Sequence, residues 1–321
     1  MRVLSGVQPS GALHIGNYFG AIRQFVELQR EHDCYFFLAD LHALTSVHDA
    51  ARLRELVGDL ATGYLALGLD PARAALYRQS DLAEIPELTW YLSTATSMGL
   101  LQRCHSFKDK VAQGVIPNHG LFAYPVLMAA DVLLVRSDVV PVGRDQKQHL
   151  EVTRDIAASF NATYGCEVFK MPEPLIHDEV AVVPGLDGQK MSKSYGNTID
   201  LFGPEKEIRS RIMSITTDST PVESPKPKQG SALYGLLKLF APAEERAWIE
   251  GAFADGGTGY GEMKKRLFGY YMATFGEARR RYEELRRHPE EVEAVLASGA
   301  KRARAIAVPL MDEVRAAVGI R

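Results

Sequence analysis

The first 185 residues alternate short β-like runs with helical patterns, and this alternation restricts the fold more than any other feature of the sequence. The β-like runs cover residues 2–7, 34–38 and 74–79, and the helical patterns between and after them cover 15–28, 51–67 and 84–103. A near-continuous apolar run such as 34–38 is typical of a parallel strand covered on both faces. The order predicts a doubly wound, Rossmann-like α/β domain with a parallel sheet over residues 1–185.

The remainder of the chain changes character in two steps. After a helix at 125–135, a strand at 139–142 and a helix at 145–161, residues 172–188 are expected to be extended and loop-like. From about residue 204 the β pattern is lost, and helices are predicted at 209–215, 232–240, 243–253, 262–286, 289–296 and 300–318. We therefore expect a linker over 186–200 and a helical domain over 201–321, whose terminal helices can return to the first domain.

Two glycine-flanked turns have the composition of phosphate-binding segments. Gly188–Gly196 places Lys190 and Lys193 three residues apart among serines, so two flexible ammonium groups can close on a polyphosphate. On its own, such a loop is more often a solvated basic segment. The second turn, His14–Asn17, stands where a strand and turn lead into a helix N-terminus, which favours an anion. Together the two turns indicate a nucleotide site.

The His14–Asn17 turn also brings small residues to the expected helix start. Gly16 and Gly20 are four residues apart and would share one helical face, which leaves room for a flat nucleotide against the backbone. His14 and Asn17 could donate hydrogen bonds to phosphate oxygens.

A buried helix carries one acidic residue. Apart from Asp131, the stretch from Tyr124 to Val135 is apolar on all sides, and Tyr124, Met128 and Asp131 share one face. A carboxylate there needs a donor. The donor can be a neighbouring amide of the core or a ligand with one N–H or O–H at its rim, and both interpretations remain open.

Further candidates lie at strand ends, where ligands of open α/β sheets bind. Gly143 follows a strand, Asp145 can be a helix N-cap or a ligand contact, and Gln146 can face the same cleft. His42 fits a core histidine as well as a site wall. Lys110 lies in the polar, glycine-containing stretch 105–118, which we expect to be a loop.

Composition excludes several protein classes. The three cysteines are widely spaced and odd in number, which argues against a structural zinc site and for a reducing compartment. The sequence lacks a signal-peptide pattern and an apolar run of about 20 residues, so we expect a cytoplasmic protein without a membrane partner. Residues 201–321 carry 20 Lys and Arg against 17 Asp and Glu, a weak indication of a polyanionic partner.

These motifs resemble those of a known family. The HIGN turn and the KMSKS loop are similar to the nucleotide-binding motifs of class I aminoacyl-tRNA synthetases. The segments at 5–11, 124–131 and 140–149 look like those of bacterial tryptophanyl-tRNA synthetases, and the likeness covers nearly the whole chain. The resemblance implies that ATP and L-tryptophan give tryptophanyl-adenylate and pyrophosphate, followed by transfer to tRNA(Trp).

The resemblance also implies roles for individual residues. Asp131 would accept the indole N–H, Met128 would lie against the ring, and Tyr124 and Gln146 would lie near the α-amino group. The pocket would also include Leu4, Gln8 and His42. ATP would be held by Gln8, Ser10, His14, Gly16, Asn17, Gly20, Gly143, Asp145, Met191 and Ser192. The catalytic set would be His14, Asn17 and the phosphate-binding lysines Lys110, Lys190 and Lys193. Mg²⁺ would be bound through phosphate oxygens rather than by a protein metal site, and the family implies a homodimer.

Two positions depart from the family pattern, and the function is not restricted to one enzyme. Tyr195-Gly196 replaces an acidic residue and proline after KMSKS, and Leu4 stands where an aromatic wall is common. A tyrosyl-tRNA synthetase also fits the motifs, because an aspartate can accept a phenolic O–H. A non-catalytic synthetase paralogue with an RNA-binding or regulatory role, or a different nucleotidyltransferase, would share parts of the pattern.

Overall fold

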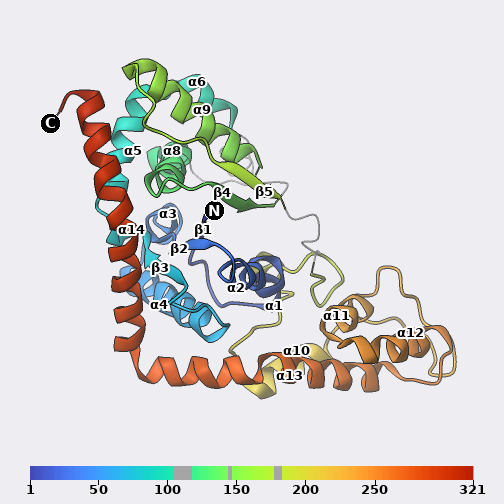
Figure 1. Ribbon diagram of the computed structural model, residues 1–321. Helices are drawn as coiled ribbons and strands as arrows, with labels where there is room; N and C mark the ends of the chain where they lie inside the picture. The colour runs from blue at the N-terminus through green and yellow to red at the C-terminus, as the bar shows by residue number, and fades with distance from the viewer. Residues whose placement is uncertain (105–117, 144–146, 177–182, 321) are drawn as a thin grey trace.

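The computed structural model describes residues 1–104, 118–143, 147–176 and 183–320, and it confirms the doubly wound α/β architecture (Figure 1). One parallel sheet of five strands has the order β3-β2-β1-β4-β5. The strands are β1 (Arg2–Val7), β2 (Asp33–Leu38), β3 (Ala74–Arg78), β4 (Val139–Val142) and β5 (Glu173–Ile176). The chain starts in the centre of the sheet and builds it outward in both directions.

Side-chain alternation along the strands divides the core into two layers. Val3 and Phe36 belong to one buried cluster, and their neighbours Leu4 and Phe37 belong to the other. Because successive strand residues point to opposite faces, each central strand contributes to both clusters. The sheet is therefore covered on both sides, as its apolar strands require.

The helices of the α/β part flank this sheet. The first cluster includes residues of α2 and α4, and the second includes residues of α5, α8 and α9. The helical elements are α1 (Ile15–Asn17), the π-helical turn η1 (Tyr18–Ile22), α2 (Arg23–Leu28), α3 (Asp40–Ala43), α4 (Ala50–Ala66), the 3₁₀ turn η2 (Gln79–Asp81), α5 (Glu84–Ala95), α6 (Met98–Arg103), α8 (His119–Leu134), α9 (Lys147–Tyr164) and the 3₁₀ turn η4 (Lys193–Tyr195).

The C-terminal part is helical and L-shaped in Figure 1. It comprises α10 (Glu205–Met213), α11 (Ala232–Phe240), the 3₁₀ turn η5 (Ala243–Glu245), α12 (Arg246–Ala254), α13 (Tyr260–Arg287) and α14 (Pro289–Val318). The helix α13 runs beside α11 and α10 back toward α4 of the α/β part, and α14 continues along β3. None of the helices in the described ranges is both long and apolar enough to cross a membrane.

The path of α14 depends on a glycine. A Cβ atom on Gly299 would lie 1.9 Å from the carbonyl oxygen of Leu76 in β3, so only a glycine lets the helix come this close to the strand backbone. Two arginines of α14 then pair with α5: Arg304 with Glu84, and Arg315 with Glu87. The last helix is thus attached to the α/β part along much of its length.

Four element predictions were wrong in detail. Residues 173–176 form the edge strand β5 instead of a loop. The strand was not predicted because Pro174 weakens the strand pattern, although proline is tolerated in an edge strand. The helix expected over 84–103 is divided into α5 and α6, and Ser97 caps the second helix. The expected helices 289–296 and 300–318 are the single helix α14. His42 lies in the short helix α3 rather than at the end of β2.

The strand register defines the edge where a site can form. Val7 of β1 pairs with Leu38 of β2, and Leu38 pairs with Arg78 of β3, so the carboxyl ends of the three strands coincide. The residues that follow each strand therefore meet at one edge of the sheet.

Candidate active site

Backbone hydrogen bonds join the two motif segments directly. The amide of Ile15 donates to the carbonyl of Ile199 at 2.9 Å, and the amide of Leu201 donates to the carbonyl of Leu13 at 2.9 Å. His14 lies between them and forms an isolated antiparallel bridge with Asp200. The HIGN turn and the segment that follows the KMSKS loop are therefore fixed to each other, although they are far apart in the sequence.

His14 is a buried, neutral imidazole at this junction. Its exposed fraction is 6%, and Nδ1 has no hydrogen-bond partner among the described residues. Burial and the nearby Lys193 ammonium lower its pKa to about 4. A Cβ atom on Gly16 would lie 2.8 Å from this Nδ1 atom, so the glycine leaves the space that the ring occupies. A buried polar atom without a partner is costly, and a ligand can supply the missing partner.

Asn17 has a local role in the same turn. Its Oδ1 atom accepts a hydrogen bond from the amide of His14 at 3.0 Å, which holds the turn at the start of α1. Gly20 lies in the π-helical turn η1, so its position relative to Gly16 differs from that in a regular α-helix. A Cβ atom on Gly20 would have no heavy atom of another described segment within 4 Å, so space is open beside it.

The KMSKS loop places Lys193 over the turn that follows β1. Its Nζ atom donates to Ser10 Oγ at 3.4 Å, and a Cβ atom on Gly11 would lie 3.5 Å from its side chain. Burial lowers the pKa of Lys193, and the Asp200 carboxylate opposes this shift. Lys193 therefore stands near His14 with only weak pairing, whereas Lys190 is exposed on the same loop.

Neighbouring residues of the loop are more firmly placed. Met191 is buried, and its Cβ atom lies 3.5 Å from the position that a Cβ atom on Gly16 would occupy. The hydroxyls of Ser192 and Ser194 lie 2.8 Å apart. Gly196 ends η4 with φ of +64°, a conformation that glycine adopts readily, so the Tyr195-Gly196 variation fits the local turn.

Asp131 has donors within the protein. Gln79 Nε2 lies 2.8 Å and 3.0 Å from its two carboxylate oxygens, and His42 Nε2 lies 2.9 Å from Oδ2. The side chain of Asp131 is 1% exposed. Burial raises the pKa of Asp131, and the hydrogen bonds with His42 and Gln79 oppose that shift. An ionised carboxylate has about four acceptor positions, and these bonds use three.

The orientation of Gln79 is determined by the backbone. Its Oε1 atom accepts from the amides of Leu41 and His42 at 3.1 Å and 3.3 Å, so its NH₂ group must face Asp131. Gln79 directly follows β3 and is fully buried. The sequence prediction missed it, although its position at the end of a strand was a usable signal.

The predicted face of α8 borders this carboxylate. Tyr124 Oη lies 3.1 Å from His149 Nε2, and the Tyr124 ring is 6.3 Å from that of His42 in an edge orientation. Met128 is half-buried one turn from Tyr124. Leu4 is 1% exposed and belongs to the same core cluster as α8.

Two of the remaining candidates, Gln8 and Gly143, lie in the described part of the chain. Gln8 follows β1, and its Nε2 atom lies 3.5 Å from the His42 carbonyl and 3.4 Å from Ser46 Oγ. Gly143 follows β4 at the same edge of the sheet. Lys110, Asp145 and Gln146 lie outside the described residues. In the described part of the chain, no three His, Cys, Asp or Glu residues form a group that could hold a metal ion.

The geometry gives this edge two chemically different ends. Neutral His14, a helix start and the lysines suit a polyphosphate, because they offer donors and cations. The Asp131 end combines one fixed acceptor with an aromatic ring and a thioether, which suits a flat ligand with a single donor.

Comparison with known proteins agrees with these features. The family model described as "tRNA synthetases class I (W and Y)" matches residues 1–231. The tryptophan–tRNA ligase of Rhodopirellula baltica is 51% identical over the full length of both chains, and that of Fusobacterium nucleatum is 50% identical over 99% of this chain and 98% of its own. The crystal structure of tryptophanyl-tRNA synthetase from Campylobacter jejuni complexed with ADP and tryptophan is 47% identical, with a TM-score of 0.95 over 99% of this chain and 100% of that one. The chain therefore belongs to the class I tRNA synthetases of the tryptophan and tyrosine group.

Proposed function

We propose that this protein activates L-tryptophan with ATP and transfers the tryptophanyl group to tRNA(Trp). The carrying observation is the backbone ladder that fixes the His14 turn to the segment directly after the KMSKS loop, at the sheet edge where Asp131 also lies. The relatives that bear the name tryptophan–tRNA ligase support the same activity.

In this proposal Asp131 selects the amino acid. Three of about four acceptor positions on its carboxylate are occupied, and the indole N–H takes the remaining one. Gln79 cannot turn away because its oxygen is held by two backbone amides. Met128 lies against the ring, Tyr124 and Gln146 lie near the α-amino group, and Leu4, Gln8 and His42 complete the tryptophan pocket. A hydrogen-bonding site of this kind rejects a side chain without the donor by about 10⁴-fold or more.

The other end holds ATP. The tryptophan carboxylate displaces pyrophosphate at the α-phosphorus, so negative charge grows on the leaving group. Lys193, Lys190 and Lys110 bind that charge, and His14 donates a hydrogen bond as a neutral ring. Ser10, Gly16, Asn17, Gly20, Gly143, Asp145, Met191 and Ser192 complete the proposed nucleotide site. Mg²⁺ bound to phosphate oxygens would neutralise part of the charge.

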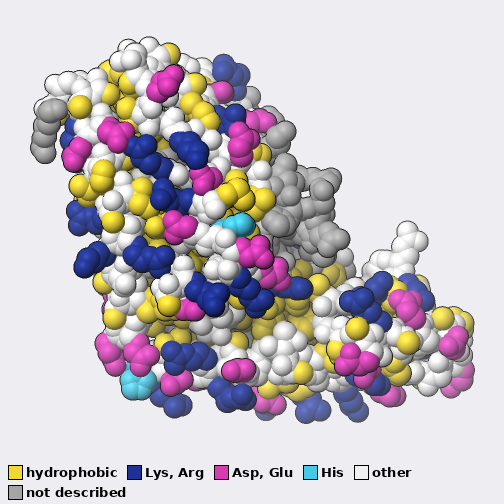
Figure 2. All heavy atoms as spheres, viewed as in Figure 1, with side chains coloured by type: hydrophobic (Ala, Val, Ile, Leu, Met, Phe, Trp, Pro, Cys, Tyr) yellow, Lys and Arg dark blue, Asp and Glu magenta, His cyan; other side chains and the backbone are white. Residues whose placement is uncertain are grey.

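The domain division supports the second step. We propose a catalytic domain over 1–185, the KMSKS linker over 186–200 and a helical tRNA-binding domain over 201–321. Figure 2 shows Lys and Arg side chains interspersed with Asp and Glu along the lower edge, where α13 lies, and the exposed basic residues of α13 include Lys265, Arg280, Arg286 and Arg287. Such cations can contact the phosphate backbone of tRNA.

We further propose a homodimer that works in the cytoplasm, where tRNA is charged. Trp90 in α5 and Met98 in α6 are 69% and 61% exposed. Large apolar side chains in this position favour burial against a second copy of the chain.

Pyrophosphate exchange tests the activity. The purified protein should exchange labelled pyrophosphate into ATP with tryptophan, and far more slowly with tyrosine or phenylalanine at equal concentration. Faster exchange with tyrosine would identify a tyrosyl enzyme. The absence of exchange with any of the three at saturating ATP and Mg²⁺ would contradict an activating enzyme and favour a non-catalytic paralogue.

A further inference from the structure

Asn197 is a buried polar residue directly after the KMSKS loop. It is 3% exposed, whereas Asp187 through Lys190 and Ser194 through Gly196 are exposed. A Cβ atom on Gly185 would lie 2.2 Å from the Asn197 side-chain nitrogen, so the amide packs directly against bare backbone. Buried side-chain amides are normally hydrogen-bonded, so the burial of Asn197 indicates that its amide bonds to the surrounding loop.

All polar atoms of this side chain bind the loop. Its Nδ2 atom donates to Asp187 Oδ1 at 2.8 Å and to the Lys190 carbonyl at 3.2 Å. Its Oδ1 atom accepts from the amide of Ser192 at 2.8 Å. The bonds fall on Asp187 three residues before Lys190, on Lys190 itself and on Ser192 directly after Met191. One side chain therefore fixes the backbone at Lys190 and next to Lys193.

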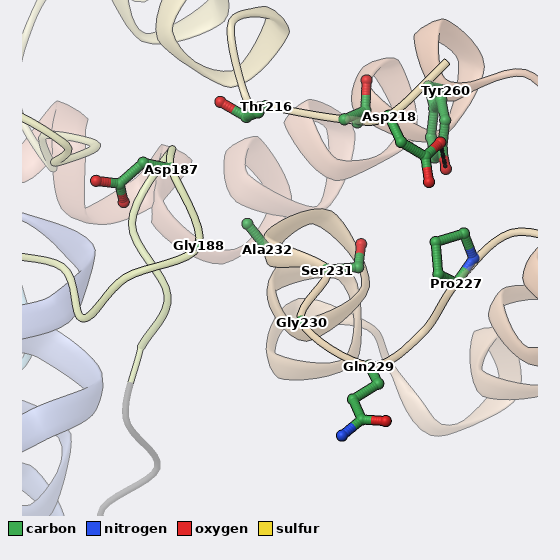
Figure 3. Close-up of a pocket in the computed structure, with 11 residues that line it drawn as sticks. Asp187, Gly188, Thr216, Asp218, Pro227, Gln229, Gly230, Ser231, Ala232 and Tyr260 are labelled. Atoms are coloured by element: carbon green, nitrogen blue, oxygen red, sulfur yellow. Dashed lines mark hydrogen bonds between the residues drawn. The ribbon is translucent and has the colours of Figure 1, made fainter. Parts of the chain in front are cut away.

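The opposite side of the loop is packed less closely. A cavity of about 300 Å³ lies between Asp187-Gly188 and the segments 216–218 and 227–232 of the helical part (Figure 3). The Asp187 carboxylate points away from Tyr260 and Asp218, which line the far wall. The turn at Asp187-Gly188, which precedes Lys190, is thus hydrogen-bonded to Asn197 through the Asp187 side chain and borders the cavity on its other side.

Asn197 is also connected to the His14 turn. Its carbonyl accepts from the amide of Leu186 at 3.0 Å, and two residues later the Ile199 carbonyl accepts from Ile15. Arg211 of α10 donates to the carbonyls of Gly196 and Thr198 at 2.8 Å and 3.1 Å, on either side of Asn197. Residues 196–199 are therefore held at both flanks, which makes Asn197 a fixed point for the loop.

We infer that Asn197 is a positioning residue for ATP activation: through Asp187, Lys190 and Ser192 it sets the loop backbone so that Lys190 and Lys193 both reach the triphosphate. The inference rests on the proposed function. It assigns Asn197 to the nucleotide step and leaves tryptophan binding to the Asp131 end.

The direct test replaces the donor by an acceptor of the same size. In Asn197→Asp, a carboxylate faces the Asp187 carboxylate and the Lys190 carbonyl, so the loop is displaced. We expect kcat for tryptophan-dependent pyrophosphate exchange to fall by about 100-fold, as misplaced reacting groups typically cause. The KM for tryptophan should stay unchanged, and the variant should remain folded at the assay temperature, although a buried carboxylate that faces two acceptors lowers the thermal unfolding midpoint. Wild-type kcat in this variant, or a loss seen only in the KM for tryptophan, would overturn the inference.

Two further variants separate geometry from charge. Asn197→Asp combined with Asp187→Asn restores a donor and acceptor pair with reversed direction, and it should recover about tenfold of the lost kcat. Gln189→Glu adds the same charge to the same turn through an exposed side chain and should change kcat less than about threefold. An equal loss in Gln189→Glu, or no recovery in the double variant, would overturn the inference because charge alone would explain the effect.

Asp187→Ala provides a test that does not depend on substitution inside the core. Asp187 is exposed, so the variant should fold, yet it removes one acceptor of Asn197. We expect about a fivefold lower kcat at an unchanged KM for tryptophan, and an unchanged kcat would count against the inference. If wild-type protein shows no amino-acid-dependent exchange, the proposed function fails; if wild type is active and these variants match it, only the role of Asn197 fails.

Discussion

The Asp131 end and the lysine end of the site lie at the same sheet edge but differ in how their polar groups are paired. At the Asp131 end, Gln79 is bonded to two amides and to the carboxylate, and His42 bonds to the carboxylate as well. At the lysine end, His14 Nδ1 is buried without a partner among the described residues, and Lys193 Nζ makes one long contact with Ser10.

This difference separates selection from catalysis. A buried hydrogen-bond network whose polar groups are paired is rigid. It selects between amino acids by the single hydrogen-bond donor that the Asp131 carboxylate can still accept. Unpaired donors and cations cost stability in the free protein, and they are matched only when an anion binds. We therefore expect substitutions at the Asp131 end to affect stability or selectivity, and substitutions at the lysine end to affect rate without loss of stability.

Lys193→Met should produce the largest effect. Removing one preorganised charge from the leaving group costs about 10²- to 10³-fold in rate, which single-turnover formation of the adenylate measures. Because the folded state lowers the pKa of Lys193, it disfavours the ammonium, and loss of the charge should not lower the unfolding midpoint. The exposed Lys206→Met in α10 is the matched control. A large loss of stability in Lys193→Met would contradict the expectation that substitutions at the lysine end lower the rate but not the stability.

Gln79→Met tests the opposite end through stability. The substitution keeps a similar volume but leaves the His42 amide without its side-chain acceptor and removes one hydrogen bond each from the Leu41 amide and the Asp131 carboxylate, which keep Asp40 and His42 as partners. Buried groups without partners cost about 1–3 kcal/mol, so the free energy of unfolding in urea should fall by at least that much. Gln102→Met, on an exposed position of α6, should be nearly neutral. A neutral Gln79→Met would mean that the network is not rigid.

The sequence predicted the fold from features that are local along the chain. Strand alternation separates Val3 from Leu4 into opposite core layers, and the predicted helix 232–240 has the bounds of α11. The break that was predicted between the helices 289–296 and 300–318 has a tertiary cause. Gly299 lies in that break, and its contact with β3 is one that only the tertiary structure provides.

The site shows the same limit. The lysine loop and the HIGN turn are visible as motifs, but the ladder between Leu13–Ile15 and Ile199–Leu201 is not, because it depends on how distant segments meet. Gln79 and Asn197 look like ordinary polar residues after a strand and in a loop. Their importance arises from burial and from bonds to backbone atoms, and the only local signal is that Gln79 directly follows a strand.

Asp131→Asn should alter selectivity with little change in stability. The Asn oxygen can still accept from Gln79, and its NH₂ group can face His42 in the tautomer that accepts. The indole N–H then meets a neutral amide oxygen instead of an anionic carboxylate, so discrimination between tryptophan and phenylalanine in pyrophosphate exchange should fall by about tenfold. Unchanged discrimination would refute the role of Asp131 as the selecting acceptor.

His14→Gln should have the smallest effect, because it replaces one neutral donor by another. With a pKa of about 4, the imidazole stays uncharged as pH falls from 8 to 6, so its titration cannot shape kcat/KM for ATP in that range. We expect a loss of only a few-fold and parallel pH profiles for the variant and wild type, with a further loss of about tenfold in His14→Ala, which lacks a donor. A wild-type profile that changes between pH 8 and 6 and becomes flat in His14→Gln would show that the ring is charged when ATP binds. The lysine end would then bind the nucleotide with an additional cation, the His14 imidazolium, rather than with a neutral donor. His14 Nδ1 would lack a hydrogen-bond partner only in the free protein.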